Sequence, residues 1–481
     1  MADEVGAEPD APPGTELLEH AATRSVDSAR IARRLTRSAS WHSASRRRRV
    51  VAMPNDGVRV GILRPVRSLP ARITETIAPE RLGRSFRWLL ASAIVSNAGD
   101  GVAITAGPLL VASQTRDPFL VSMALLSEYL PVLLFGVIGG AAADRLDRRR
   151  MVIVVNVGRA IVLSALVATI VTHSVNIAVV LVALFILGTA ETFADSASST
   201  LIPGLVARED LGIANARMQG AFLLTNQLLL PPIGAFLFAV GMALPFATNA
   251  AAFALGALLI SRVVTSTRER TGEGAGLRAE MVEGIRWLVA HPPMRTLALT
   301  IFTFNVTYGA AWSVLVLYAG DRLGMNEVGF GLLTTAIAVG GIVGMLAYGR
   351  LERRFSLGDI MRVGLLIETG THLVFALTMS AAVALATLVV FGAHAFVWGT
   401  TSTVVRQRAV PDELLGRVGG VYRVAIMGGL VIGTPIGGLL AKTFGITAPF
   451  WFAFAGSALL VAILWRQFDL IVHAGNEVDG R

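Results

Sequence analysis

Long apolar stretches recur along most of this chain and limit how it can fold more than any other feature. Between residues 88 and 464, runs of about 20 apolar residues alternate with short breaks where charged residues gather. A helix of this length crosses the hydrocarbon core of a bilayer and satisfies its own backbone hydrogen bonds there. Only 16% of the 481 residues are charged, against about 25% in an average soluble domain. The sequence therefore predicts an all-α membrane protein.

The apolar runs predict twelve transmembrane helices, six on each side of a polar stretch. The predicted spans cover residues 88–112, 119–142, 151–172, 176–203, 213–240, 242–261, 294–319, 328–348, 360–379, 381–405, 416–441 and 446–464. They divide the chain into an N-terminal six-helix bundle (87–264), a cytoplasmic linker (265–293), a C-terminal six-helix bundle (294–467) and a cytoplasmic tail (468–481).

Residues 1–86 are polar and are predicted to form a disordered, basic cytoplasmic tail. Its first twenty residues are acidic, and the rest is rich in arginine, with four in a row at 46–49. Such a segment is typical of a solvated extension, or of one that binds nucleic acid or anionic lipid. Alternatively, translation starts at Met53. A solvated extension or a translation start at Met53 is favoured over a binding segment, so no nucleic-acid partner is expected.

The net charge of +9 comes almost wholly from arginine, and its distribution predicts the orientation. Arginine excess marks the cytoplasmic side of a membrane protein. The alternate loops carry little more than Arg116, Arg322 and Lys442. The other set carries Arg145, Arg148, Arg149, Arg150, Arg208, Arg268, Arg270, Arg353, Arg354, Arg406 and Arg408. Both termini and the central linker are therefore predicted to be cytoplasmic, in a multi-pass protein of the bacterial inner membrane.

The two predicted bundles also resemble each other at a constant shift of 204 residues. At this shift Gly136 and Gly140 meet Gly340 and Gly344, and Arg149-Arg150 meets Arg353-Arg354. Pro231 and Gly234 meet Pro435 and Gly438 in the same way. Because each half holds an even number of spans, both insert with the same orientation. The shift therefore predicts a parallel pseudo-two-fold repeat, an architecture of transporters that bind substrate between the repeats.

An ordered set of charges joins the second and third spans. It begins at Gly140, continues with Asp144 and Arg145, and ends with Asp147 and the arginines at 148–150. A small residue lets two helices approach closely, and a carboxylate is favoured near its own arginines or a helix N-terminus. We interpret Gly140, Asp144, Arg145, Arg148 and Arg149 as a conformational latch on the cytoplasmic side. The alternative is an anchor that only sets topology.

This segment resembles the G-x-x-x-D-R-x-G-R-R signature of the major facilitator superfamily. More locally, the chain is similar to the drug-efflux branch that includes macrolide and enterobactin exporters. The matching segments include Gly99-Asp100, residues 191–195, 201–206, 214–217, 317–321 and 406–417, so the resemblance covers about residues 86–464. It implies a secondary transporter that works by alternating access, without an enzymatic activity or a cofactor.

The sequence departs from that pattern at three places. Asp147 replaces the second glycine of the signature, and Leu230 replaces the glycine that exporters carry before Pro231. Span four lacks the membrane-embedded arginine of many proton antiporters. Small-residue packing is still expected from Pro231, Pro232, Gly234, Pro435 and Gly438.

The resemblance implies that spans one, four, seven and ten line the central cavity, and each carries polar or aromatic groups at mid-depth. An ionisable group at a helix centre costs about 2.5–3.5 kcal/mol to insert, so it faces a cavity or a partner. Asp100 is the first candidate for proton coupling, and its alternative is an interhelical hydrogen bond or a capping role beside Gly99 and Gly101. Glu191 is the second, and its alternative is a pairing with neighbouring backbone or with Asn226. The other candidates are Asp195, Asn305, Tyr308, Trp312, His394 and Trp398. The aromatic members could form the wall of a lipophilic site or pack as ordinary core.

Four further residues complete the set. Glu128 in span two is a candidate gate residue, and Asn226 in span five is placed to reach the cavity from the side. Glu368 and His372, one turn apart in span nine, are expected to satisfy each other in the protein interior.

These features predict an exporter of small lipophilic compounds that exchanges them for protons, a monomer in the lipid bilayer. Uptake or facilitated diffusion of a metabolite is the first alternative, and a non-transporting membrane sensor is the second. The chain has no cysteine, and no nucleotide-binding loop or metal-ligand cluster is recognised in the sequence.

Overall fold

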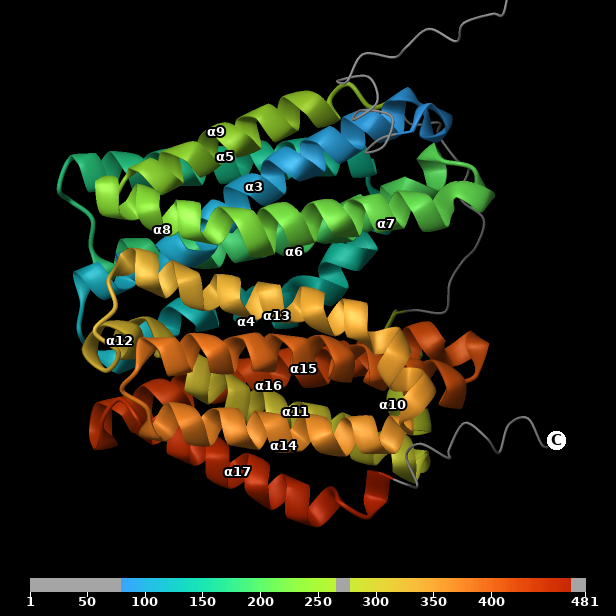
Figure 1. The fold of residues 1–481 in the computed structure, drawn as a ribbon. Coiled ribbons are helices and arrows are strands. Elements are labelled where there is room, and N and C mark those ends of the chain that lie inside the picture. The colour runs from blue at the N-terminus through green and yellow to red at the C-terminus, as the bar shows by residue number, and fades with distance from the viewer. Residues whose placement is uncertain (1–78, 265–276, 469–481) are drawn as a thin grey trace, which may run out of the picture. The chain divides into compact units, whose positions relative to one another are not determined.

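The computed structural model describes residues 79–264 and 277–468, which lie within one compact unit, Ser68–Arg481. Residues 1–78 of the predicted tail 1–86, residues 469–481 of the predicted tail 468–481 and the first part of the linker, 265–276, lie outside the described residues. Residues 80–86, predicted as part of the disordered tail, are helical instead. The described elements are helices (Figure 1). In the N-terminal half they are η1 (Glu80–Leu82), α3 (Gly83–Gln114), α4 (Pro118–Arg145), α5 (Arg148–Val171), α6 (Ile177–Leu205), η2 (Arg208–Asp210), α7 (Leu211–Phe222), η3 (Leu223–Leu229), α8 (Leu230–Val240) and α9 (Leu244–Ile260).

The linker contributes a helix that the sequence did not predict, α10 (Leu277–Ala290). The C-terminal half then contains α11 (Pro292–Trp312), α12 (Leu315–Asp321), α13 (Glu327–Arg354), α14 (Leu357–Leu377), α15 (Ala381–Ala409), η4 (Asp412–Leu414), α16 (Leu415–Phe444) and α17 (Ala448–Leu464). Ten helical segments of the described chain are long and apolar enough to cross a bilayer. The two shorter apolar helices are α9 and α17.

Side-chain caps explain where several of these helices begin. Asp117, Asp147 and Asn176 accept a hydrogen bond from a backbone N–H in the first turn of α4, α5 and α6. Asn326, Ser356 and Ser380 do the same for α13, α14 and α15. Such caps satisfy amide groups that a helix N-terminus leaves unpaired. Asp147, which replaces the second glycine of the loop signature, therefore has a local role as the N-cap of α5.

The helix bounds follow the 204-residue shift only in the later part of each half, from α6 and α15 onward. Ile177–Leu205 and Ala381–Ala409 differ by 204 at both ends, and so do Leu244–Ile260 and Ala448–Leu464. The bounds of α4 and α13 differ by 209 instead. The loop before α13, residues 322–326, is longer than the loop before α4, residues 115–117. The predicted alignment of Gly136 and Gly140 with Gly340 and Gly344 therefore does not match their positions in the two helices. The alignment of Arg149-Arg150 with Arg353-Arg354 is wrong as well, because the first pair lies at the start of α5 and the second at the end of α13.

The packing around the glycines also differs between α4 and α13. Gly340 and Gly344 leave no room for a side chain, because the backbone of α15 at Val389 and Ala393 lies against them. Among the described residues, no atom lies within 4 Å of the place where a Cβ of Gly136 or Gly140 would stand. The close approach of α4 to α6 occurs at Gly139, where a Cβ would meet the Ser196 hydroxyl at 3.1 Å.

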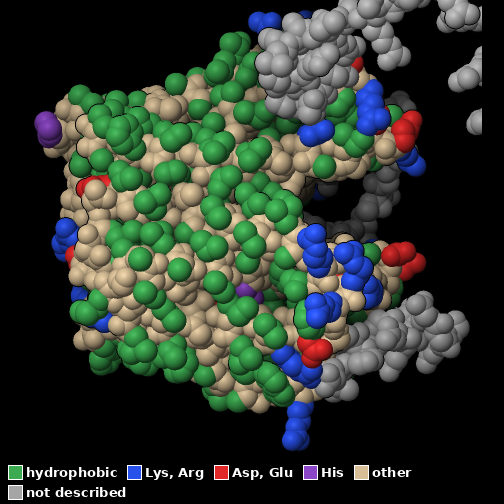
Figure 2. Space-filling model, viewed as in Figure 1, with side chains coloured by type: hydrophobic (Ala, Val, Ile, Leu, Met, Phe, Trp, Pro, Cys, Tyr) green, Lys and Arg blue, Asp and Glu red, His purple; other side chains and the backbone are tan. Residues whose placement is uncertain are grey.

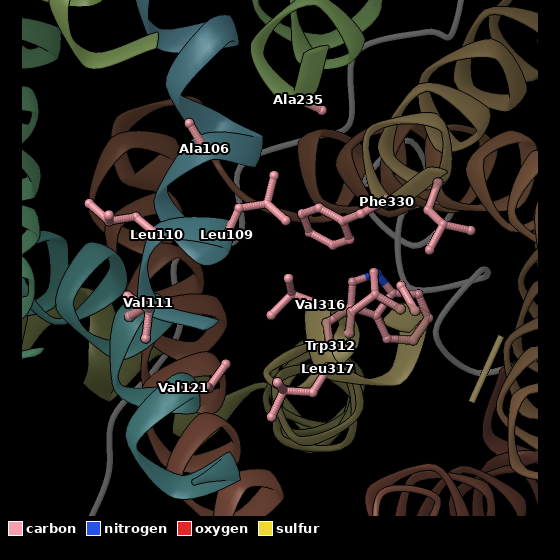
Figure 3. Close-up of a cluster of buried hydrophobic side chains, with 14 of the residues drawn as sticks. Ala106, Leu109, Leu110, Val111, Val121, Ala235, Trp312, Val316, Leu317 and Phe330 are labelled. Carbon is pink, nitrogen blue, oxygen red and sulfur yellow. The ribbon is translucent and has the colours of Figure 1, made fainter. Parts of the chain in front are cut away.

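Buried apolar side chains form one continuous core at one end of the bundle and two separate cores at the other. The continuous core includes α3, α4, α8, α11, α12 and α13, so it joins the two halves (Figure 3). Leu109 and Val121 of the first half lie opposite Trp312, Val316 and Leu317 of the second in that view. At the opposite end one core holds only residues from 82 to 263, and the other only residues from 288 to 468.

We call the joined end the closed end and the other the open end. Two ion pairs connect the halves at the closed end, Arg116–Asp321 at 3.2 Å and Lys442–Asp117 at 2.6 Å. Ion pairs between described residues at the open end, such as Arg417–Glu283, stay within one half. In Figure 1 the closed end lies at the left, beside α12, and the open end at the right, beside α10. Figure 2 shows a hollow at the right-hand edge with basic side chains beside it.

Candidate functional site

Asp100 lies near the middle of α3, where two glycines let other helices approach the backbone. A Cβ on Gly99 would collide with the Asn249 side chain of α9. A Cβ on Gly101 would lie 2.5 Å from the Thr225 carbonyl oxygen and 2.9 Å from Cα of Asn226, both in η3. Because neither neighbour carries a side chain, α3 packs tightly on both sides of Asp100. The carboxylate itself keeps a side-chain exposure of 20%.

Arg159 of α5 is the cation that this carboxylate meets. Its guanidinium donates to Oδ1 of Asp100 at 3.2 Å and lies 3.5 Å from Oε2 of Glu191 in α6. The same group sits 4.0 Å above the ring of Phe253 from α9. The Arg159 side chain is only 5% exposed, whereas that of Glu191 is 51% exposed. One buried arginine therefore joins four helices of the N-terminal half and leaves one of its two carboxylate partners accessible.

Two further carboxylates interact with this pair. The charge of Glu128 in α4 acts on both Asp100 and Glu191, and Asp195, one turn after Glu191, lies in the field of Arg159. The Arg423 guanidinium of α16, in the other half, also acts on Asp195. The structure thus brings together the four acidic cavity candidates predicted from the sequence. Asp100, Glu191 and Asp195 interact with the buried Arg159 guanidinium, and Glu128 interacts with the first two of these carboxylates.

Arg159 was not predicted, because span three is not one of the four spans that the resemblance places around the cavity. The signal was present: Arg159 is the one charged residue inside an otherwise apolar run, 151–172. A charged group there must find a partner. The alternative that Glu191 pairs with Asn226 is not what the structure forms. Asn226 is buried and accepts from Gln227 at 2.6 Å.

The predicted pair in span nine is confirmed and gains a third member. His372 Nε2 lies 3.1 Å from Oε1 of Glu368, and His394 Nε2 of α15 lies 3.2 Å from Oε2 of the same carboxylate. Glu368 and His372 are fully buried and His394 is 6% exposed. His394 therefore faces α14 and not an open cavity.

The aromatic candidates also lie mostly within the protein. Trp312 is buried and stacks on Tyr308 at 4.7 Å between ring centroids, and Trp398 is buried and stacks on Phe304 at 5.9 Å. Tyr308 is only half-buried. Asn305, likewise half-buried, donates to the carbonyl oxygen one turn earlier in its own helix. Among these candidates, Asn305 and Tyr308 alone have a clear exposed surface in this conformation.

At the open end, the arginines of the predicted latch bind within the N-terminal half. Arg148 donates to the carbonyl oxygens of Ala143 in α4 and Thr200 in α6, at 3.2 and 2.9 Å. Arg149 donates to the carbonyl oxygen of Ser261, which follows α9. Arg145 is exposed, and the side chain of Asp144 lies outside the described residues. In this conformation the described arginines hold helix ends of one half together.

The predicted packing motif contacts both halves. The backbone of Val102 in α3 lies directly against Gly234, and Gly438 of α16 lies against Phe119 and Ser122 of α4. A Cβ on Gly331 of α13 would lie 3.2 Å from Cα of Pro232. Pro231 accepts a hydrogen bond from the Thr105 hydroxyl at 2.8 Å. Pro435 lies inside α16, three residues before Gly438.

The profile of a family described as transmembrane secretion effectors matches residues 74–479, most of the chain. The chain belongs to this family. It is thus a multi-pass efflux transporter of the major facilitator superfamily, and the resemblance to its drug-efflux branch is confirmed.

Two curated relatives are similar along most of the chain. The multidrug efflux pump Tap of Mycolicibacterium fortuitum is 28% identical, over 75% of this chain and 90% of that protein. The enterobactin exporter EntS of Shigella boydii serotype 4 (strain Sb227) is 24% identical, over 75% of this chain and 89% of that protein.

Solved structures agree on the fold. The nucleoside transporter NupG superposes with a TM-score of 0.64 at 12% identity, covering 80% of this chain and 99% of that one. A bacterial homologue of the iron transporter ferroportin, in an inward-facing state, superposes with a TM-score of 0.64 at 18% identity, covering 80% and 98%. At these identities the likeness concerns the fold alone.

Proposed function

We propose that this transporter exports small lipophilic compounds by alternating access and exchanges them for protons bound at Asp100. The observation that carries the proposal is a buried ion pair, Asp100–Arg159, with the accessible Glu191 beside it, inside a bundle closed at one end only. Three carboxylates around one buried guanidinium, with Glu128 beside two of them, give an excess of negative charge. A proton or a cationic substrate can neutralise that excess.

The membrane topology belongs to the same proposal. We take the two 17-residue apolar helices, α9 and α17, as the sixth and twelfth spans, in two halves related by a parallel repeat. Their bounds, Leu244–Ile260 and Ala448–Leu464, keep the same shift as α6 and α15, which supports that assignment. The arginine-rich loops lie at the open end, so the open end faces the cytoplasm by the distribution of positive charge.

In this orientation the structure corresponds to the state that receives substrate from the cytoplasm or the inner leaflet. The closed end holds the continuous apolar core and the ion pairs Arg116–Asp321 and Lys442–Asp117. Export requires this end to part while the open end closes. We propose that the signature loop, with Asp144, Arg145, Arg148 and Arg149, meets the other half in that second state.

The test is accumulation of a fluorescent lipophilic cation in cells that express the wild type or Asp100→Asn, with and without a protonophore. The wild type is expected to lower accumulation, and the protonophore to abolish the difference. Asp100→Asn should slow export by about tenfold or more, equivalent to about 1.4 kcal/mol in the barrier. Asp412→Asn, a matched change at an exposed residue of η4, is the control and should export normally.

Two outcomes would change the proposal. Export by the wild type that continues in the presence of the protonophore would indicate facilitated diffusion, which is the alternative considered from the sequence. Unchanged accumulation across several dyes of different shape would exclude a multidrug exporter and leave a carrier of narrow specificity.

A further inference from the structure

The C-terminal half holds a sealed cluster of three titratable side chains that the proposed export cycle does not use. Glu368 and His372 come from α14 and His394 from α15, and the carboxylate accepts one hydrogen-bonding contact from each imidazole. Their side-chain exposures are 0%, 0% and 3%. Nδ1 of both histidines is buried and has no hydrogen-bond partner among the described residues.

The charge of this cluster depends on how many protons it holds. With an ionised carboxylate and two neutral imidazoles its charge is −1, and with one added proton it is zero. A buried net charge costs several kcal/mol, so the sealed cluster favours the neutral form with one proton shared among the three groups. In water near neutral pH, an isolated glutamate is ionised and a histidine is mostly neutral. Sealing the cluster therefore takes up about one proton, and opening it to water releases that proton.

The surroundings supply little charge that could replace the proton. From α11, Tyr308 is the titratable group whose charge acts on Glu368. Asp359 and Arg362 pair with each other near the start of α14, at least six residues before Glu368. The charged residues of α13 lie at its two ends, those of α15 follow His394 by twelve residues or more, and α17 has none in Ala448–Leu464. Aromatic rings cover the rest: Trp312 lies edge-on to His372 at 5.6 Å and Phe391 lies edge-on to His394 at 6.0 Å.

The bond between Glu368 and His394 also joins two helices. Helices α14 and α15 pack so closely here that a Cβ on Gly364 would lie 2.9 Å from Nδ1 of His394. Separation of these helices would break this contact and admit water to the carboxylate. Protonation of the cluster and packing of the two helices are therefore linked.

We propose that Glu368, His372 and His394 form a second proton-binding site, which holds one proton while α14 and α15 are packed together. The site is separate from Asp100, which lies in the other half. It does not depend on the direction of transport.

Trp312 reports on this site, because an imidazolium next to an indole ring quenches its fluorescence. We would titrate the purified full-length protein in lipid nanodiscs and follow tryptophan emission, with Trp287→Phe as the background of every sample, because the Trp287 ring stacks on His291 at 4.8 Å and would report that histidine. The wild type is expected to show a reversible emission step within about pH 5–8, the range in which histidine charge changes. Glu368→Gln and His372→Gln should both lose the step. Asp100→Asn, in the other half, should keep it.

Trp312→Phe is the reporter control and should also lose the step, because among the described tryptophans it is the one in ring contact with His372. A wild type without any step between about pH 4 and about pH 10 would overturn the proposal and leave a purely structural ion cluster. An emission step that persists unchanged in Trp312→Phe would also overturn the proposal. The same holds for a step that persists in both Glu368→Gln and His372→Gln when these variants are folded. If the charge variants do not fold, the wild type and Trp312→Phe still decide the question.

Discussion

The N-terminal half gathers three carboxylates around Arg159, with Glu128 beside two of them, and leaves Glu191 half-exposed. The C-terminal half instead seals one carboxylate between two histidines. The first arrangement offers negative charge to an incoming proton or cation. The second is neutral once it holds a single proton and gives solvent no direct access. Under the two proposals above, the halves divide the labour: one half exposes its ionisable groups and the other couples its ionisable groups to helix packing.

The two halves also differ in helix packing. This difference predicts the largest mutational effect. Gly340→Leu would drive a side chain into the backbone of α15 at Val389. Overpacking costs about 1–3 kcal/mol where side chains can move aside, and more where backbone blocks them. We expect most of the folded protein to be lost, measured as the monodisperse fraction in gel filtration after detergent extraction.

Gly140→Leu is the matched variant in α4, where the structure leaves open space around the glycine. It should retain a nearly normal folded fraction. Equal losses in the two variants would contradict the difference in packing. Normal folding with lost export in Gly140→Leu would instead support a role of Gly140 in the second conformational state.

Removing the cation of the N-terminal cluster should have the next largest effect. Arg159→Gln leaves Asp100 and Glu191 without a cation, and breaking a buried ion pair from one side costs about 3–5 kcal/mol. We expect a lower thermal midpoint and loss of proton-driven export. The double variant with Asp100→Asn should recover much of the midpoint but no export, because the unpaired charge is gone while the proton site is not restored.

A stability loss in the double variant equal to the sum of the two single losses would show that Arg159 and Asp100 are energetically independent. That result would break the contrast with the C-terminal cluster, because the N-terminal charges would then be structural as well.

The smallest effect is expected at the closed end, between the halves. The hydrogen bond from Lys442 holds the pKa of Asp117 below its usual value. The ion pair therefore favours the closed end above the usual pKa of an aspartate, and this contribution is lost as the pH falls through the lowered value. Both partners are partly exposed, so the pair is worth about 1 kcal/mol or less and is weakened by salt.

Asp117→Asn should change the ratio of molecules with this end closed to molecules with it open by about fivefold or less. The measurement is the distance between spin labels at Ser113→Cys and Thr443→Cys, which is convenient because the native chain has no cysteine. Lower pH should reproduce the shift in the labelled wild type and have little further effect in Asp117→Asn. A wild-type distance distribution independent of pH and salt would show that the apolar core alone keeps this end closed.

The sequence by itself determined the class of fold and much of the acidic cluster. Apolar runs of membrane-spanning length admit little besides helices, and ionisable residues inside them must face a cavity or a partner. That reasoning selected Asp100, Glu191, Asp195 and Glu128, and it paired Glu368 with His372 through their spacing of one turn. The 209-residue shift between α4 and α13 and the α10 helix were not predicted, because neither changes the hydrophobic pattern of the spans.

Only the tertiary structure decided which groups meet across helices. Arg159 stands 59 residues from Asp100 and 32 residues before Glu191, and no periodicity within one helix reports such a contact. The depth of His394 in span ten predicted that it faces the cavity. In the structure it contacts Glu368, because Gly364 lets α15 approach α14. Sequence patterns record the face and depth of each residue within its own helix. Partners between helices depend on rotation and close approach, which are set by the packing of the whole bundle.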